Sequence, residues 1–175
     1  MNINLDSKRL VLRSFIQEDW LDMKELWIDY ANSVYACYDQ ANPLDDVSIY
    51  ERINAWIYIN NKTKFHHYLA VCNKVKVIGF FSIHPYQNGC ELGYAFHSAY
   101  HHLGFASEAL TTLLQFLKDN GCLVCYVRTG LKNIPSVNLL RRNSFTCIDT
   151  EPISFYKDDD DNPIYFTGGI FKKEL

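Results

Sequence analysis

The chain has 175 residues, of which 48% are hydrophobic and 21% are charged. This length and composition predict a single folded domain over residues 1–175 and exclude an intrinsically disordered chain. A formal net charge of −3 argues against a nucleic-acid partner, because nucleic-acid-binding proteins usually present a basic face. The same charge is compatible with a partner that carries an amine.

The cysteines and the N-terminal residues indicate a reducing compartment. Residues 1–10 (MNINLDSKRL) lack the apolar core of a signal peptide, and no apolar run approaches membrane-spanning length. We therefore expect a cytoplasmic protein with six free thiols and no membrane partner. Cys122 and Cys125 form a C-x-x-C pair, but an apolar run follows and no second pair appears, so we expect neither a redox nor a metal role.

The first half of the chain predicts one strand and two helices before the sheet continues. Residues 8–15 (KRLVLRSF) alternate in the manner of a strand. Residues 19–30 and 48–59 repeat apolar side chains at helical spacing. Ser48 is the expected N-cap of the second helix, with Glu51 at the capping-box position.

Three strands in series are predicted next, at residues 66–72, 75–85 and 89–98. Asn73 and Lys74 separate the first two strands and favour a hairpin turn. This order predicts an antiparallel meander at the centre of the sheet.

The second half predicts a helix, a buried strand, a short helix and a final hairpin. The ranges are a helix that begins at Gly104, a strand at 123–130, a helix at 135–142, and strands at 145–151 and 164–171. The KDDDDNP segment between the last two strands is a hairpin loop, and its consecutive acids lack the alternating ligand spacing of a calcium loop. Together these elements predict an α+β domain with a mixed sheet and no metal.

Gly104 and the small residues Ala106 and Ser107 open the helix with the clearest apolar face. The first N–H groups of a helix have no partner within it, and small residues let a ligand approach them. With the positive end of the helix dipole, these donors form an anion site that phosphate often occupies. The alternative is that Gly104 only turns the chain.

Two long segments and the first strand resemble a known family. ELGYAFHSAYHHLGFASEAL and VRTGLKNIPSVNLLRRNSF are similar to the central motifs of the GNAT superfamily of acyl-CoA-dependent N-acyltransferases, and KRLVLRSFIQEDW resembles the start of its RimJ/RimL-type branch of ribosomal-protein-alanine N-acetyltransferases. The resemblance runs from Lys8 to Phe171. It implies a mixed, mostly antiparallel sheet of about seven strands, splayed in the middle, with helices on both faces.

The resemblance also implies a binding loop for the diphosphate of acetyl-CoA. The family loop Q/R-x-x-G-x-G/A falls on His101, His102, Leu103, Gly104, Phe105 and Ala106. Ser107 follows this loop and is also expected to contact the cofactor. His101 stands where Gln or Arg is common, and Leu103 stands where a polar residue is common. The alternative is a solvated loop with two surface histidines.

Further cofactor contacts are implied by the strand at 91–97, which resembles the family strand that parts from its neighbour. The resemblance implies that pantetheine pairs with this backbone and that a free N–H near Phe96 or His97 polarises the thioester carbonyl. Asn133 and Ser136 match an N-x-x-S pattern, which implies that Asn133 contacts pantetheine and that Ser136 lies near the sulfur. Capping of the following helix is the alternative for both.

Two catalytic groups are predicted. Many family members place a tyrosine where this chain has Leu140, so Ser136 is the candidate donor to the leaving thiolate. Attack by an amine also needs a proton acceptor, for which Glu91 is the first candidate and His84 and Glu151 are weaker ones. The alternative for Glu91 is a salt bridge to a neighbouring strand.

The implied activity is transfer of an acetyl group from acetyl-CoA to a primary amine by direct attack in a ternary complex. The branch resemblance points to a protein N-terminus as acceptor. A small-molecule amine (a polyamine, amino acid or antibiotic) and a non-catalytic acyl-CoA-binding sensor are the alternatives. The expected determinants of the acceptor are the aromatic segment 34–44, the strand around Phe81 and the last hairpin, and a homodimer is compatible with the sequence.

Overall fold

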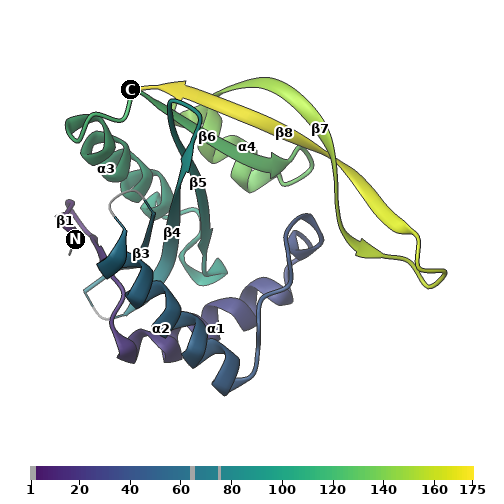
Figure 1. Ribbon diagram of the computed structural model, residues 1–175, viewed down its shortest axis with the longest axis horizontal. Helices are drawn as coiled ribbons and strands as arrows, with labels where there is room; N and C mark the ends of the chain where they lie inside the picture. The colour runs from purple at the N-terminus through teal and green to yellow at the C-terminus, as the bar shows by residue number, and fades with distance from the viewer. Residues whose placement is uncertain (1–2, 64–65, 75) are drawn as a thin grey trace.

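A computed structural model describes residues 3–63, 66–74 and 76–175 and shows one mixed sheet with helices on both faces (Figure 1). The strands are β1 Asn4–Asp6, β2 Val11–Ser14, β3 His67–Cys72, β4 Val77–Tyr86, β5 Gly89–Phe96, β6 Val124–Gly130, β7 Thr146–Lys157 and β8 Pro163–Glu174. The helices are α1 Trp20–Ala31, α2 Asp46–Lys62, α3 Phe105–Asp119 and α4 Ile134–Arg142, with 3-10 turns η1 Gln17–Asp19, η2 Ala36–Tyr38 and η3 Ser98–Tyr100. Within these ranges, no helix combines the length and apolar character needed to cross a bilayer.

The strand order is β1-β2-β3-β4-β5-β6-β8-β7, and all neighbours are antiparallel except β5 and β6, which are parallel. This confirms the predicted α+β class with a mixed, mostly antiparallel sheet. The sheet has eight strands rather than about seven, because residues Asn4–Asp6 pair with β2 and add an edge strand.

Alternation along the central strands divides the apolar side chains between two cores. Leu69 and Val71 of β3 are fully buried in the core that includes residues of α3 and α4. Ala70 and Cys72 of the same strand point to the opposite face, where they pack in the core that includes α1 and α2. The sheet is therefore covered by one helix pair on each face.

One predicted helix start differs from the structure. Asp45, rather than Ser48, is the N-cap of α2, because the Asp45 carboxylate accepts the Ser48 backbone N–H at 2.9 Å. The prediction of a capping box formed by Ser48 and Glu51 is therefore wrong. The hairpin at Asn73 is confirmed by its backbone N–H, which donates to the Lys76 carbonyl at 3.1 Å. Residue 75, where the predicted strand began, lies outside the described residues.

The final hairpin is longer than predicted and extends away from the rest of the domain (Figure 1). The Tyr156 hydroxyl lies 3.4 Å from the Ala36 carbonyl of η2, and the Phe166 and Tyr38 rings are 5.1 Å apart. Two of the segments expected to choose the acceptor, 34–44 and the last hairpin, are thus in contact.

Candidate active site

The parallel strands β5 and β6 are paired at one end and separate at the other. Their partner pairs are Cys90 with Cys125 and Glu91 with Tyr126, and both strands continue beyond this pairing to Phe96 and Gly130. α3 and α4 begin beyond these C-terminal ends. The predicted splay is therefore present, and it leaves backbone groups in the middle of the sheet for an extended ligand.

The backbone donors that face this split belong to alternate residues of β5. The His97 N–H donates to the carbonyl of Ile78 in β4 at 3.0 Å, so it is directed toward β4. Because donors alternate along a strand in an antiparallel ladder, the N–H groups of Tyr94 and Phe96 are directed toward β6. The expected free N–H is thus not that of His97, and Phe96 remains the candidate.

Gly104 has the backbone geometry of an anion-binding loop. Its φ is 79°, in the left-handed region that glycine favours, and it is the N-cap of α3. Glu108 is the first residue whose N–H bonds within the helix, to the Gly104 carbonyl at 3.0 Å. The N–H groups of Phe105, Ala106 and Ser107 therefore have no intrahelical partner, and these residues fit the diphosphate of acetyl-CoA.

Arg9 braces this loop, and its role was not predicted. Its guanidinium pairs with the Glu108 carboxylate at 2.6 Å, donates to the Leu103 carbonyl at 3.0 Å and lies 4.3 Å from the centre of the Phe105 ring. Burial opposes ionisation of Glu108, but hydrogen bonds from Ser7 and Arg9 outweigh it and lower the Glu108 pKa. Arg9 thus compensates a negative charge in the first turn of α3.

Two predicted loop residues hold the loop with their side chains. The His101 Nε2 lies 2.9 Å from the Phe96 carbonyl, which ties the loop to the end of β5. The Ser107 hydroxyl accepts the Asn143 side-chain amide at 3.2 Å. His102 and Leu103 are exposed. The Ser107 hydroxyl accepts the bond from Asn143, so its own O–H can still donate to a phosphate.

Ser136 and Tyr94 meet at the start of α4. Asn133 caps this helix by accepting the Ser136 N–H at 3.4 Å, as the capping alternative stated. The Ser136 hydroxyl lies 2.9 Å from the Tyr94 hydroxyl of β5. Burial raises the pKa of Tyr94, and the hydrogen bond to Ser136 opposes that shift only in part, so the phenol stays protonated near neutral pH.

Sequence reasoning treated Tyr94 as part of the apolar alternation of β5. Its neighbours Leu92 and Phe96 are indeed buried in the core shared with α3 and α4, and Tyr94 packs against that core. The available signal was the hydroxyl group, because a tyrosine in a core usually has a polar partner for its oxygen.

Arg128 organises the opposite face of the sheet. Its guanidinium pairs with Glu91, pairs with Glu151 at 2.9 Å and donates to the Tyr86 hydroxyl at 2.8 Å. The hydrogen bond with Glu91 is the main cause that raises the pKa of Arg128. The salt-bridge alternative for Glu91 is therefore present in the structure.

The three predicted proton acceptors lie together on this face. Glu91 is the cross-strand partner of His84, and Glu91 and Glu151 share Arg128. Burial lowers the pKa of His84, and the charge of Glu91 opposes that shift. Since side chains alternate along β5, Glu91 and Tyr94 point to opposite faces of the sheet. The candidate acid and the candidate base thus approach the split from opposite sides.

The mixed, mostly antiparallel sheet with its parted strands β5 and β6 is the fold of an acyl-CoA-dependent acyltransferase domain. A family model described as the acetyltransferase (GNAT) domain matches residues 9–146. The chain belongs to this family and is an acetyl-CoA-dependent acetyltransferase. Among curated proteins, none matches the chain significantly in sequence.

Solved structures share the fold at low sequence identity. An acetyl transferase from Salmonella typhimurium that modifies the N-terminal serine of a 50S ribosomal subunit protein has a TM-score of 0.83 and 14% identity, with 99% of each chain covered. The RimL protein acetyltransferase in complex with coenzyme A has a TM-score of 0.81 and 13% identity, with 99% of this chain and 98% of that chain covered. The microcin C7 self-immunity acetyltransferase MccE, in complex with acetyl-CoA and AMP, has a TM-score of 0.79 and 16% identity, with 96% and 93% covered.

Proposed function

We propose that this acetyltransferase modifies the N-terminal amine of a protein by direct attack in a ternary complex. The observation that carries the proposal is the split between β5 and β6, which opens to α3 and α4 on one face and to Glu91 and Arg128 on the other. Cofactor and acceptor can therefore meet from opposite faces of the sheet. Direct transfer needs both reactants to be held next to each other at the same time, and such a site allows it.

On the cofactor face, acetyl-CoA supplies an activated acetyl thioester. The N–H groups of Phe105, Ala106 and Ser107 would hold its diphosphate, and the Phe96 N–H would polarise the thioester carbonyl. The Ser136 hydroxyl donates a hydrogen bond to the departing thiolate, and Tyr94 donates to Ser136 in turn. Tyr94 thus takes over the part of the tyrosine that Leu140 replaces.

On the acceptor face, Glu91 accepts the proton of the amine, directly or through water. Arg128 pairs with Glu91 and holds its carboxylate in place on this face. Glu91 and Glu151 together carry two negative charges against the single positive charge of Arg128. The remaining negative charge suits an acceptor that arrives as an ammonium group.

Acceptor choice falls to η2 and the final hairpin. Tyr38 of η2 lies against Gly130 at the end of β6, where a β-carbon would come within 2.9 Å of its ring. Phe166 of the hairpin contacts the same ring. Phe81, expected to contribute, is fully buried against Tyr94 and Phe96, so it contacts no acceptor directly. The segment 34–44 and the final hairpin, rather than the central strand, therefore form the proposed acceptor-binding surface.

The test is an acetylation assay with peptides that begin with Ser or Ala, their N-terminally blocked counterparts, and a panel of polyamines, amino acids and aminoglycosides. We expect thiol release and a mass increase of one acetyl group on free peptide N-termini only. Acetylation confined to small amines would replace the proposal with the small-molecule alternative. Acetyl-CoA binding without turnover on any acceptor would favour the sensor.

A further inference from the structure

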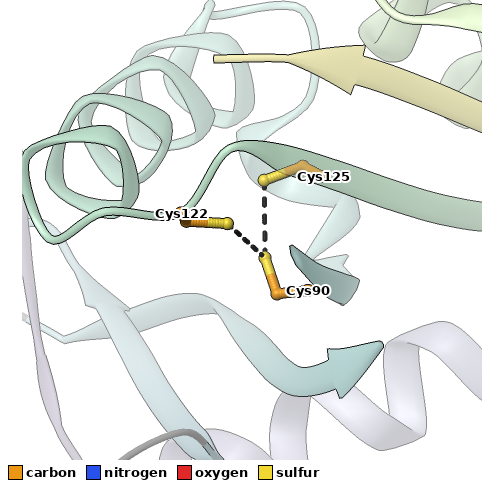
Figure 2. Close-up of side chains that lie close together, drawn as sticks. All are labelled: Cys90, Cys122 and Cys125. Atoms are coloured by element: carbon orange, nitrogen blue, oxygen red, sulfur yellow. Dashed lines mark hydrogen bonds between the residues drawn. The ribbon is translucent and has the colours of Figure 1, made fainter. Parts of the chain in front are cut away.

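Three cysteines that are separate in the sequence meet at the closed end of the split (Figure 2). Cys90 and Cys125 are buried cross-strand partners on β5 and β6, and the half-buried Cys122 comes from the loop after α3. The Cys90 sulfur lies 3.4 Å from that of Cys125 and 3.6 Å from that of Cys122. The sequence argument against a metal at the C-x-x-C pair rested on the apolar run that follows it and on the lack of a second pair, and the fold adds one more thiol, that of Cys90.

The backbone around the three thiols holds them close together. At Gly89, a β-carbon would come within 1.9 Å of the Val124 carbonyl, so only glycine allows the start of β5 to lie so close to the start of β6. This approach places Cys90 opposite Cys125. The three sulfur atoms therefore come from two core strands and an adjoining loop. Because a cysteine side chain is short, the backbone largely fixes where each sulfur atom lies.

The spacing of the sulfur atoms suits one shared ion. All three lie within 4.8 Å of one another. Thiolates that bind one zinc ion at about 2.3 Å in tetrahedral geometry lie about 3.8 Å apart. Two of the observed spacings, 3.4 and 3.6 Å, are slightly shorter than this value, and the third is no longer than 4.8 Å, so small side-chain rotations bring the three sulfur atoms to equal distances from a common centre.

The surroundings favour a soft cation. Cys90 and Cys125 belong to the core that includes Leu92, Leu113 and Leu117, which offer no competing oxygen or nitrogen ligands. Among the described residues, no other His, Cys, Asp or Glu joins the group. Thiolate ligands select zinc and Cu(I) over hard cations. Cys122, the partly exposed member, provides the route of entry.

We propose that Cys90, Cys122 and Cys125 form a binding site for one thiophilic d¹⁰ cation, Zn(II) or Cu(I), that joins β5, β6 and the loop after α3. On binding, each S–H bond breaks, the proton passes to solvent, and a sulfur–metal bond forms without any change of oxidation state. The ion would lie at the closed end of the split, where its ligand Cys90 directly precedes Glu91 on β5. The bound ion would hold the paired ends of β5 and β6 together, next to the point where the two strands separate.

The test loads the reduced full-length protein with Zn(II) and, separately and without oxygen, with Cu(I), and then removes unbound metal. We expect about one ion per chain, X-ray absorption that shows sulfur neighbours, and a higher melting temperature for the loaded protein. The ion that is retained against a competing chelator identifies the preferred metal. Absence of stoichiometric binding in both arms would overturn the proposal.

Cysteine variants assign the site. Cys90→Ser and Cys122→Ser should each abolish stoichiometric binding, and circular dichroism shows whether they fold. The matched control is the double variant Cys37→Ser/Cys147→Ser, which removes the two exposed cysteines and should bind normally. Loss of binding in this control, or full binding by the folded Cys122→Ser variant, would place the metal elsewhere and overturn the proposal. Because the readout is metal content, failure of the acetylation assay does not affect this test.

Discussion

The hydroxyl of Tyr94 on β5 lies 2.9 Å from the hydroxyl of Ser136 at the start of α4. This contact joins the two sides of the split at the level where α4 begins. Leu140, one turn beyond Ser136, occupies the place where many family members have a tyrosine, and it is fully buried. The phenol hydroxyl that α4 lacks therefore reaches the same region from a different element.

Tyr94→Phe should lower kcat by about 100-fold while changing the Kd of CoA little, because it removes a hydrogen-bond donor and no apolar contact. Ser136→Ala should have a similar effect. If the two hydroxyls act as one donor chain, the double variant should be hardly slower than either single variant. Steady-state kinetics and CoA titration measure these values. Multiplicative losses would show that the two groups act independently.

Gly104→Glu should weaken CoA binding by at least tenfold, or about 1.4 kcal/mol, because it adds a side chain and a negative charge where the diphosphate is expected. Gly121→Glu is the matched control. Gly121 also has a left-handed φ, of 83°, and a β-carbon there meets nothing within 4 Å. Both variants should lose about 1–2 kcal/mol of stability from backbone strain, and only the first should lose affinity. Equal CoA affinities by calorimetry would refute the loop assignment.

The order of elements was predictable because each carries a local signal. α3 shows a regular apolar face, and Gly104 marks its start as predicted. The extra strand β1 was missed because its three residues are too few to show alternation. β7 was predicted to end at residue 151 and β8 at residue 171, and none of the residues that extend them (152–157 and 172–174) is buried, so no apolar period marks these extensions.

The contacts across the sheet were not predictable in the same way. Arg9 and Glu108 are 99 residues apart in the chain, and Cys90 and Cys125 are 35 apart. No periodicity links such pairs, since only the register of the strands and the position of α3 bring them together. Ser136 was found from a local motif, whereas its partner Tyr94 required the fold.

Arg9→Gln should weaken CoA binding by about 1 kcal/mol, roughly fivefold in Kd, because it leaves the Glu108 carboxylate uncompensated beside the diphosphate loop. Adding Glu108→Gln should restore part of the affinity by removing that charge. CoA titration of the single and double variants makes the comparison. A double variant that binds no better than Arg9→Gln would show that Arg9 acts by shaping the loop rather than by charge.

The stability of the protein should fall in mild acid because of His66 and His84. Their rings are 4.3 Å apart, and burial lowers the pKa of both, with a further contribution to His66 from His84 and His67. The unfolded chain therefore binds these protons more readily than the folded protein does. The stabilising contribution is complete above about pH 6.5 and is lost as the pH falls toward the lowered pKa values.

Urea unfolding at several pH values checks this prediction. The free energy of unfolding should decrease from neutral pH to mild acid, and His84→Gln should reduce that dependence. Glu91 faces His84 and favours its protonated form, so Glu91→Gln should make the dependence steeper. An unchanged pH dependence in His84→Gln would assign the acid sensitivity to other groups.

Glu91→Gln should lower kcat by about 100-fold if Glu91 accepts the proton of the amine. The substitution preserves shape, and Arg128 keeps its pairing with Glu151. Glu151→Gln is therefore the matched control: it removes the same charge from the same guanidinium and should slow the reaction much less. Equal losses in the two variants would mean that the net charge around Arg128, rather than proton transfer to Glu91, supports the reaction, because both substitutions change that charge alike.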